Sequence, residues 1–226
     1  MRFSIITITK NNPIGFEKTR ASLHCQTYDD YEWVVIDGDV EPDNGIYEAM
    51  NKGIDRANGD YLIFMNAGDQ FANENVLAML AQYDAGFIYG DAMEGGFVKR
   101  SKHHAQIGDG MITHHQSMIY RRSVVNDLRY DEQYPIAADY KFTIEYTARC
   151  KSFLKMDMAI CDYEMGGVSQ INAKQGRIEQ IKIRRELGMK KPLTFYRQWL
   201  TQMIRHYCPN IYLKIRMIAK QSTDAV

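Results

Sequence analysis

Short apolar runs alternate along this chain with longer segments in which apolar positions recur at helical spacing. Runs that are nearly continuous in apolar and β-branched residues predict buried strands at 3–9, 33–36, 61–65, 86–89 and 159–164. Helical spacing predicts helices over 13–26, 46–58 and 75–83, and another that begins after Ala137. This alternation predicts an α/β fold with a mostly parallel central sheet flanked by helices, similar to a Rossmann fold.

Length and charge narrow the class of protein. The 226 residues suffice for one large domain, which we place at 1–183, followed by a basic and aromatic helical extension over 184–226. The 28 basic residues balance the 28 acidic residues, so no overall field favours nucleic acid as a partner. The four cysteines form no CxxC pair, and no window is apolar enough to cross a bilayer, which together predict a cytoplasmic protein.

Polar residues follow several predicted strands at the point where each one ends. Asp37 comes after the second strand, and the segment from Asn66 to Asp69 follows the third. Ligands bind beyond the carboxyl ends of the strands in open parallel sheets, so these residues are candidates for a binding site. Oxygen ligands of this kind suit Mg²⁺ or Mn²⁺, although Asn66-Ala-Gly-Asp69 is equally good turn chemistry.

Five segments resemble the family 2 glycosyltransferases of the GT-A fold, especially those that build bacterial capsular polysaccharides and exopolysaccharides such as colanic acid. The first two resemble the family's opening strand and the helix and strand that lead to its base-binding Asp. The third resembles its strongest stretch, and the last two resemble the late catalytic block and the acceptor-side turn. The segments are Ser4–Asn11, Ser22–Gly38, Glu41–Gly59, Ile136–Tyr140 and Gly166–Ser169.

The resemblance implies a role for each matching position. Asp139 would be the general base of an inverting transfer, and Asp69 would hold the metal, Mn²⁺ or Mg²⁺, on the donor diphosphate. The alternative for Asp139 is a helix N-cap. The donor, a sugar linked to UDP or GDP, would bind at Thr7, Thr9, Asp37, Gly38, Asn51, Lys52 and Asn66. The acceptor, a saccharide or lipid-linked saccharide, would lie beside Gly167 and Ser169. His115 and Gln116 lie in the region expected to face the donor sugar or the acceptor, where a hydrogen-bonded structural role for the histidine is the alternative.

The chain departs from the family pattern in two places. The family has a helix and a strand between its base-binding Asp and the Glu-Pro-Asp-x-Gly-Ile-Tyr stretch, whereas here Asp39 and Val40 lead almost directly to Glu41. Either this chain is shortened or a segment is omitted from it. The second departure is Asn66-Ala-Gly-Asp69, where many members carry more acidic residues, so one carboxylate is left for the metal.

The extension has the composition of a surface-binding helix. From Arg184 to Lys220 it carries nine Lys or Arg residues and one acidic residue, interleaved with aromatic and aliphatic side chains. Such a segment can lie on an anionic membrane surface, which would place the protein on the inner face of the plasma membrane, or it can pack against protein.

Two other functions stay open at this point. One is a sugar nucleotidyltransferase, against which stands the lack of a Gly-rich, Lys-containing phosphate loop near the N-terminus. The other is a catalytically weakened subunit that binds saccharide as a scaffold, which the reduced acidic motif favours.

Overall fold

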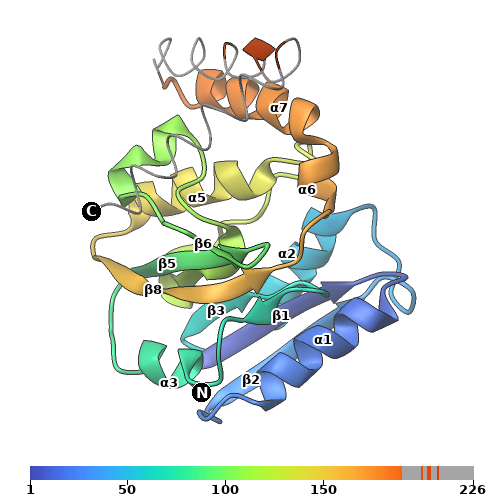
Figure 1. Ribbon diagram of the computed structural model, residues 1–226. Helices are drawn as coiled ribbons and strands as arrows, with labels where there is room; N and C mark the ends of the chain where they lie inside the picture. The colour runs from blue at the N-terminus through green and yellow to red at the C-terminus, as the bar shows by residue number, and fades with distance from the viewer. Residues whose placement is uncertain (190–199, 201–202, 205–207, 209–226) are drawn as a thin grey trace. The chain divides into compact units, whose positions relative to one another are not determined.

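The computed structural model describes residues 1–189, 200, 203–204 and 208 (Figure 1). The chain divides into two compact units, Met1–Ile183 and Arg184–Val226. Most of the basic extension lies outside the described residues, so its predicted membrane contact does too. Among the described residues, no helix is both long enough and apolar enough to span a bilayer.

The first unit is built on one eight-stranded sheet in the order β2-β1-β3-β7-β5-β8-β4, with β6 paired to β5. The strands are β1 Phe3–Thr9, β2 Tyr31–Asp37, β3 Tyr61–Phe64, β4 Gln70–Phe71, β5 Phe87–Glu94, β6 Phe97–Lys99, β7 Met118–Arg121 and β8 Phe153–Tyr163. The helices are α1 Pro13–His24, α2 Ile46–Arg56, α3 Val76–Leu80, α4 Arg122–Val125, α5 Ala138–Arg149, α6 Val168–Ile171 and α7 Ala173–Glu186. Two 3₁₀ helices, η1 His104–Asp109 and η2 His115–Ser117, complete the described elements.

The predicted α/β class is confirmed, but the sheet is more mixed than the sequence predicts. Pairs β1–β2, β1–β3 and β5–β8 are parallel, whereas β3–β7, β5–β7, β4–β8 and β5–β6 are antiparallel. The antiparallel strand β7 falls within residues 97–120, where irregular spacing hides it, and it joins the two parallel parts of the sheet. A fully buried strand reads as a continuous apolar run in either direction, so the run alone does not give the pairing.

Apolar side chains alternate between the two faces of the sheet and bury both. Phe3 and Ile5 of β1 pack with Leu23 of α1 and with the apolar side of α3 on one face. Ile6 points to the other face, where α2 approaches so closely that a Cβ at Gly53 would lie 2.4 Å from Ile6 Cγ2. The helices therefore fix where β1 and its neighbours end, and these ends carry the site.

The short link after β2 is a closed turn. Val40 N and Glu41 N both donate to the carbonyl of Asp37, at 3.1 and 2.8 Å, before the chain enters α2. β2 is consequently the edge strand at this end of the sheet. The helix and strand that the family places here are absent from this chain as it stands, and the turn joins β2 to α2 without them.

Candidate active site

A cavity of about 970 Å³ lies beyond the carboxyl ends of β1 and β3. Thr9 ends β1, Asn66 follows β3, Tyr47 begins α2 and Asp139 begins α5, and all four line this cavity. Pockets for small ligands measure roughly 300–1,000 Å³, so the space is large enough for a nucleotide that carries a sugar.

Asp139 is the carboxylate best placed for acid-base chemistry. Its Oδ1 accepts hydrogen bonds from Tyr140 N at 2.8 Å and Tyr47 Oη at 3.2 Å. The N-cap of α5 is Ala137, so Asp139 lies inside the first turn and is not the helix cap of the alternative interpretation. Burial, with a smaller contribution from the negative charge of Glu179, raises the pKa of Asp139 to about 6, and a base is most effective when its pKa is near the working pH.

His115 lies beside Asp139 and is held as a neutral ring. Its Nδ1 is 3.8 Å from Asp139 Oδ2, and its Nε2 is 3.3 Å from Asn66 Nδ2. Burial, followed by the neighbouring charge of His114, lowers the pKa of His115 to about 3. The ring is therefore uncharged at neutral pH.

Asp69, the predicted metal ligand, has both carboxylate oxygens bound within the protein. Oδ2 accepts from Gln116 Nε2 at 2.5 Å and Oδ1 accepts from Glu164 N at 2.9 Å. The side chain is almost fully buried, and this burial raises its pKa to about 6. The contacts give Asp69 a structural function, which is to tie the loop after β3 to η2 and to the end of β8.

The residues at this position do not fit a resident divalent cation. Within the residues that the structure describes, no three His, Cys, Asp or Glu side chains are placed to hold a metal ion. A Cβ at Gly68, whose φ is +111°, would lie 2.0 Å from Glu164 Oε2, so the Glu164 carboxylate fills the space of a side chain there. Glu164 Oε1 is itself paired with Lys18 Nζ at 2.8 Å. The amide oxygens of Asn66 and Gln116 are buried without a partner, but neutral amides alone are a poor set for Mg²⁺ or Mn²⁺.

The structure brings eight of the predicted site residues to the one cavity. They come from the ends of β1, β3 and β8, from η2 and from the start of α5: Thr9, Asn66, Asp69, His115, Gln116, Asp139, Gly167 and Ser169. Residues more than a hundred positions apart in the sequence thus share a surface.

Five other predicted residues are not among those that line the cavity: Thr7, Asp37, Gly38, Asn51 and Lys52. Asp37 and Gly38 still lie at the same edge, because Asp37 is in register with Thr9. Thr7 is fully buried and bonds Met65 O and Trp33 Nε1, so the expectation that it contacts the donor is corrected to a core position.

Asn51 and Lys52 hold neighbouring loops in place. Asn51 Nδ2 donates to Tyr130 O at 3.0 Å and its Oδ1 accepts from Tyr130 N at 2.8 Å, which fixes the loop before α5. Lys52 Nζ donates to Pro42 O at 2.9 Å and pairs with Glu48 at 3.1 Å. Their polar groups are engaged within the protein, and their place near the donor stays a prediction.

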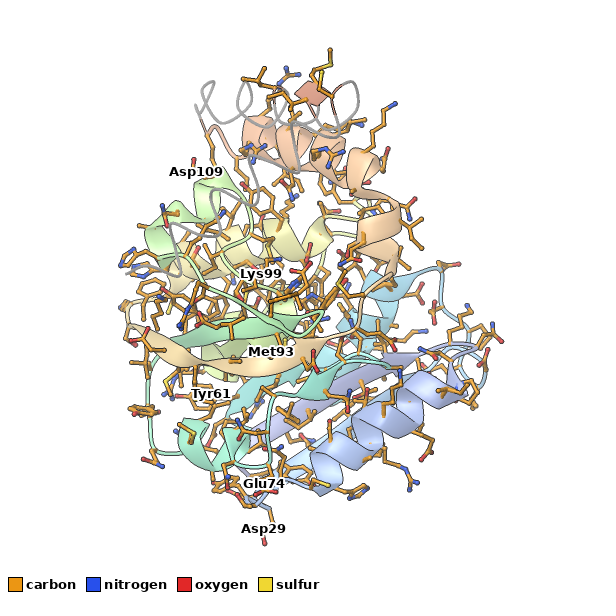
Figure 2. The ribbon with its side chains drawn as sticks, viewed as in Figure 1. Asp29, Tyr61, Glu74, Met93, Lys99 and Asp109 are labelled. Atoms are coloured by element: carbon orange, nitrogen blue, oxygen red, sulfur yellow. The ribbon has the colours of Figure 1, made fainter. Side chains whose placement is uncertain are left out.

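Several cavity residues were not singled out from the sequence. Tyr47 lies within the strongest family-like stretch, and its contact with Asp139 is the reason to add it to the site. Lys10 and Lys99 also line the cavity, and Lys99 of β6 is labelled in Figure 2. Lys10 lies in the first family-like segment, Ser4–Asn11, which assigns it no role, whereas Lys99 of β6 belongs to no motif and reaches the cavity only through the tertiary fold. Their charges would attract a diphosphate.

Comparisons with known proteins agree with this geometry. The chain has an α/β fold of the GT-A-like type. Residues 39–139 match the family model described as glycosyl transferase family 2. This stretch includes Tyr47, Asn66, His115 and Asp139.

Curated relatives carry the same description. A PGL/p-HBAD biosynthesis glycosyltransferase of Mycobacterium bovis is 26% identical over 231 aligned positions, covering 87% of this chain and 90% of the relative. An uncharacterized glycosyltransferase of Mycobacterium tuberculosis is 28% identical over 199 positions, covering 73% of this chain and 76% of the relative.

Solved structures share the fold. TarS of S. aureus in complex with UDP-GlcNAc superposes with a TM-score of 0.68 at 17% identity, over 82% of this chain and 65% of the TarS chain. The chain spans only 60% of another TarS structure. The mannosyltransferase PcManGT of Pyrobaculum calidifontis, in complex with GDP-Man and Mn²⁺, gives a TM-score of 0.60 at 14% identity, over 100% of this chain and 75% of that one. The GT-A-like fold expected from the sequence is confirmed.

Proposed function

We propose that this protein transfers a sugar from a nucleoside diphosphate onto a saccharide acceptor, with inversion at the anomeric carbon and Asp139 as the general base. The observation that carries this proposal is the cavity itself, which joins a buried, high-pKa carboxylate to the ends of β1 and β3. Fold neighbours solved in complex with UDP-GlcNAc and with GDP-Man support a nucleotide sugar as the donor.

The chemistry needs one base and one leaving group. Asp139 takes the proton of the acceptor hydroxyl as that oxygen bonds to the anomeric carbon. The bond from this carbon to the diphosphate oxygen breaks, and the nucleoside diphosphate leaves with the electron pair. Oδ1 of Asp139 accepts two hydrogen bonds, whereas Oδ2 has His115 Nδ1 at 3.8 Å, which leaves Oδ2 available to the acceptor hydroxyl in a direct displacement.

The donor would bind at the carboxyl end of β1. Thr9, with Asp37 and Gly38 at the same edge, supports placement of the base there, and Lys10 and Lys99 support placement of the diphosphate. His115, Gln116, Gly167 and Ser169 would then face the acceptor. We infer a role in cell-surface polysaccharide synthesis with a lipid-linked acceptor from the sequence resemblance, and relatives named as PGL/p-HBAD biosynthesis glycosyltransferases support a biosynthetic role.

Thermal unfolding with a panel of nucleoside diphosphates tests the donor site. UDP or GDP at about 100 times its Kd should stabilise the protein by roughly 2.7 kcal/mol, whereas ADP should not. Lys10→Met should weaken this shift, and Lys155→Met is the matched control, because Lys155 pairs only with the exposed Asp157 on β8.

Each condition is run with Mn²⁺ and with EDTA. A shift that requires Mn²⁺ would mean that the cation arrives with the diphosphate, since the described residues form no group of three His, Cys, Asp or Glu side chains that could hold it. Absence of a shift with every nucleotide, or equal shifts in Lys10→Met and the control, would contradict a donor site in this cavity. Saccharide binding without nucleotide binding would support the scaffold function instead.

A further inference from the structure

His115 lies between two polar side chains that come from distant parts of the chain. Asn66, which follows β3, approaches Nε2 of the ring at 3.3 Å, and Asp139, in the first turn of α5, approaches Nδ1 at 3.8 Å. The three residues line the same cavity. They therefore form a row from the end of β3 to the proposed base.

The orientation of the Asn66 amide assigns the ring proton of His115. With its amide nitrogen toward the ring Asn66 can only donate, so in this orientation Nε2 of a neutral His115 is the acceptor. The proton of the ring then lies on Nδ1, the atom that faces Asp139 Oδ2. A neutral histidine in this tautomer can donate to a carboxylate but cannot neutralise it.

Contacts with the surrounding protein hold Asn66 and His115 in this orientation. The backbone carbonyl of Asn66 accepts from Thr19 Oγ1 of α1 at 3.0 Å and from Asp69 N at 3.0 Å, which anchors the residue to the loop after β3. The His115 ring packs edge-on against Phe64, with 6.4 Å between ring centroids. Rotation of the ring would break one contact or the other.

We propose that His115 is a positioning residue for Asp139, and that Asn66 selects the tautomer whose Nδ1–H points at the Asp139 carboxylate. This inference rests on the proposed function, in which Asp139 is the base. At 3.8 Å the pair is longer than a hydrogen bond, but catalytic hydrogen bonds are often long in ligand-free structures and shorten when substrate is bound. The donated proton keeps Asp139 ionised and aligned for the acceptor hydroxyl.

Other groups near the same carboxylate also affect its titration. Tyr47 of α2 donates to Oδ1. The other groups that contribute charge or burial nearby are Tyr120 of β7, Tyr130 before α5, and Glu179 of α7. His114 faces His115 but pairs with Glu94. Of the described groups, only His115 is placed to donate to Oδ2, so its removal should be visible in the titration of Asp139.

Three variants separate a positioning role from a packing role. His115→Phe keeps a ring against Phe64 but has no donor, and His115→Asn can place an amide N–H where Nδ1 stands. His104→Gln is the control, because His104 stacks on Phe153 at 4.0 Å between centroids and is not among the cavity residues.

The first readout is the pH dependence of nucleotide release from UDP-GlcNAc and from GDP-Man, with water or a saccharide as acceptor. In His115→Phe the acidic limb should move up by about one pH unit, which lowers the rate about tenfold at pH values below the limb and little above it. His115→Asn should recover most of the shift, and His104→Gln should match the parent. If His115→Phe and His115→Asn lost the same fraction of the rate of nucleotide release and the acidic limb of the pH profile did not move, the ring would serve only in packing. That result would overturn the proposal.

The second readout does not depend on turnover. Carbon-13 labelling of aspartate, with the Asp139 signal assigned through Asp139→Asn, gives the titration midpoint of this carboxyl directly. The midpoint should rise in His115→Phe and return in His115→Asn, whereas an unchanged midpoint in both would refute the proposal. If the parent releases no nucleotide but the midpoint moves as expected, the proposed function fails while the interaction of His115 with Asp139 stands.

Discussion

Replacing Asp139 with Asn should stabilise the protein at neutral pH while it removes the proposed base. Burial raises the pKa of Asp139 from 3.8 to about 6, so the folded state holds the proton more tightly than the unfolded chain does. Each unit of pKa difference corresponds to about 1.36 kcal/mol, so ionised Asp139 costs up to about 3 kcal/mol of stability above pH 6. The side chain is 20% exposed, and solvent reduces this figure to about 2 kcal/mol.

The sign follows from the direction of the shift. Because the folded pKa is raised, the stabilising contribution of the protonated carboxyl is present below about pH 4 and is lost as the pH rises through about 6. Asp139→Asn is always neutral and avoids this loss. In urea denaturation, the free energy of unfolding of the variant should therefore exceed that of the parent by about 2 kcal/mol at pH 7.5 and by little near pH 4.

A matched control distinguishes this effect from a general change in charge. Asp157 on β8 has a side chain that is 90% exposed, and Asp157→Asn should alter the free energy of unfolding by less than about 0.5 kcal/mol at either pH. If Asp139→Asn were no more stable than the parent at pH 7.5, Asp139 would not be a desolvated carboxylate, and the reasoning that makes it the base would be refuted.

Three further outcomes follow from the same geometry. Asp69→Asn should destabilise the protein by about 1–3 kcal/mol in urea unfolding, which is opposite in sign to Asp139→Asn. The reason is that one oxygen, which accepts from Gln116 or from Glu164 N, becomes an amide donor. A stabilised variant would contradict the two hydrogen bonds. Gly68→Ala should lower stability by about 1–3 kcal/mol in the same assay, since a Cβ at φ +111° would meet the Glu164 carboxylate, and an unchanged midpoint would show that Glu164 moves freely. Millimolar Mn²⁺ without nucleotide should leave the thermal midpoint unchanged, because the described residues form no metal-binding group, and a rise of several degrees would reveal a ligand set that the contacts of Asp69 do not show.

The sequence predicts the strands near the site better than the contacts within it. The run that ends at Phe64 is fully buried, and the run that ends at Thr9 is buried except at Ile8 and Thr9, so composition alone predicts that they are strands, and their polar ends are correctly placed on one edge. The antiparallel β7 and the partners of β5 depend on long-range pairing, which periodicity does not encode. Only the three-dimensional structure shows these pairings.

Positions at the cavity were easier to predict where a motif lies there. Asp139 belongs to a family-like segment, and the fold places it beside His115, which lies outside those segments. Thr7 lies on the same face of β1 as Thr9, because the two are two residues apart, but it lies deeper in the sheet, where its hydroxyl is bonded to Met65 O and Trp33 Nε1. Lys99 comes from a hairpin that carries no motif, so only the tertiary structure places it at the cavity.

Asp69 shows why a motif does not by itself give the chemistry of a residue. An acidic residue after a buried strand indicates a cation site, but its chemistry depends on which groups reach its two oxygens. Here Gln116 and the backbone of Glu164 occupy them, and neither partner can be identified from spacing along the chain.

Nucleotide release tests the central claim most directly. The purified parent and Asp139→Asn are incubated at pH 7.5 with UDP-GlcNAc or GDP-Man and a mixture of saccharide acceptors, and free UDP or GDP is measured over time. Loss of a general base should reduce the rate by about 10²–10⁴-fold, while the Asp157→Asn control keeps the parental rate. Equal release by the parent and Asp139→Asn would contradict the assignment of Asp139, and no release by a parent that binds nucleotide would contradict the transferase function itself.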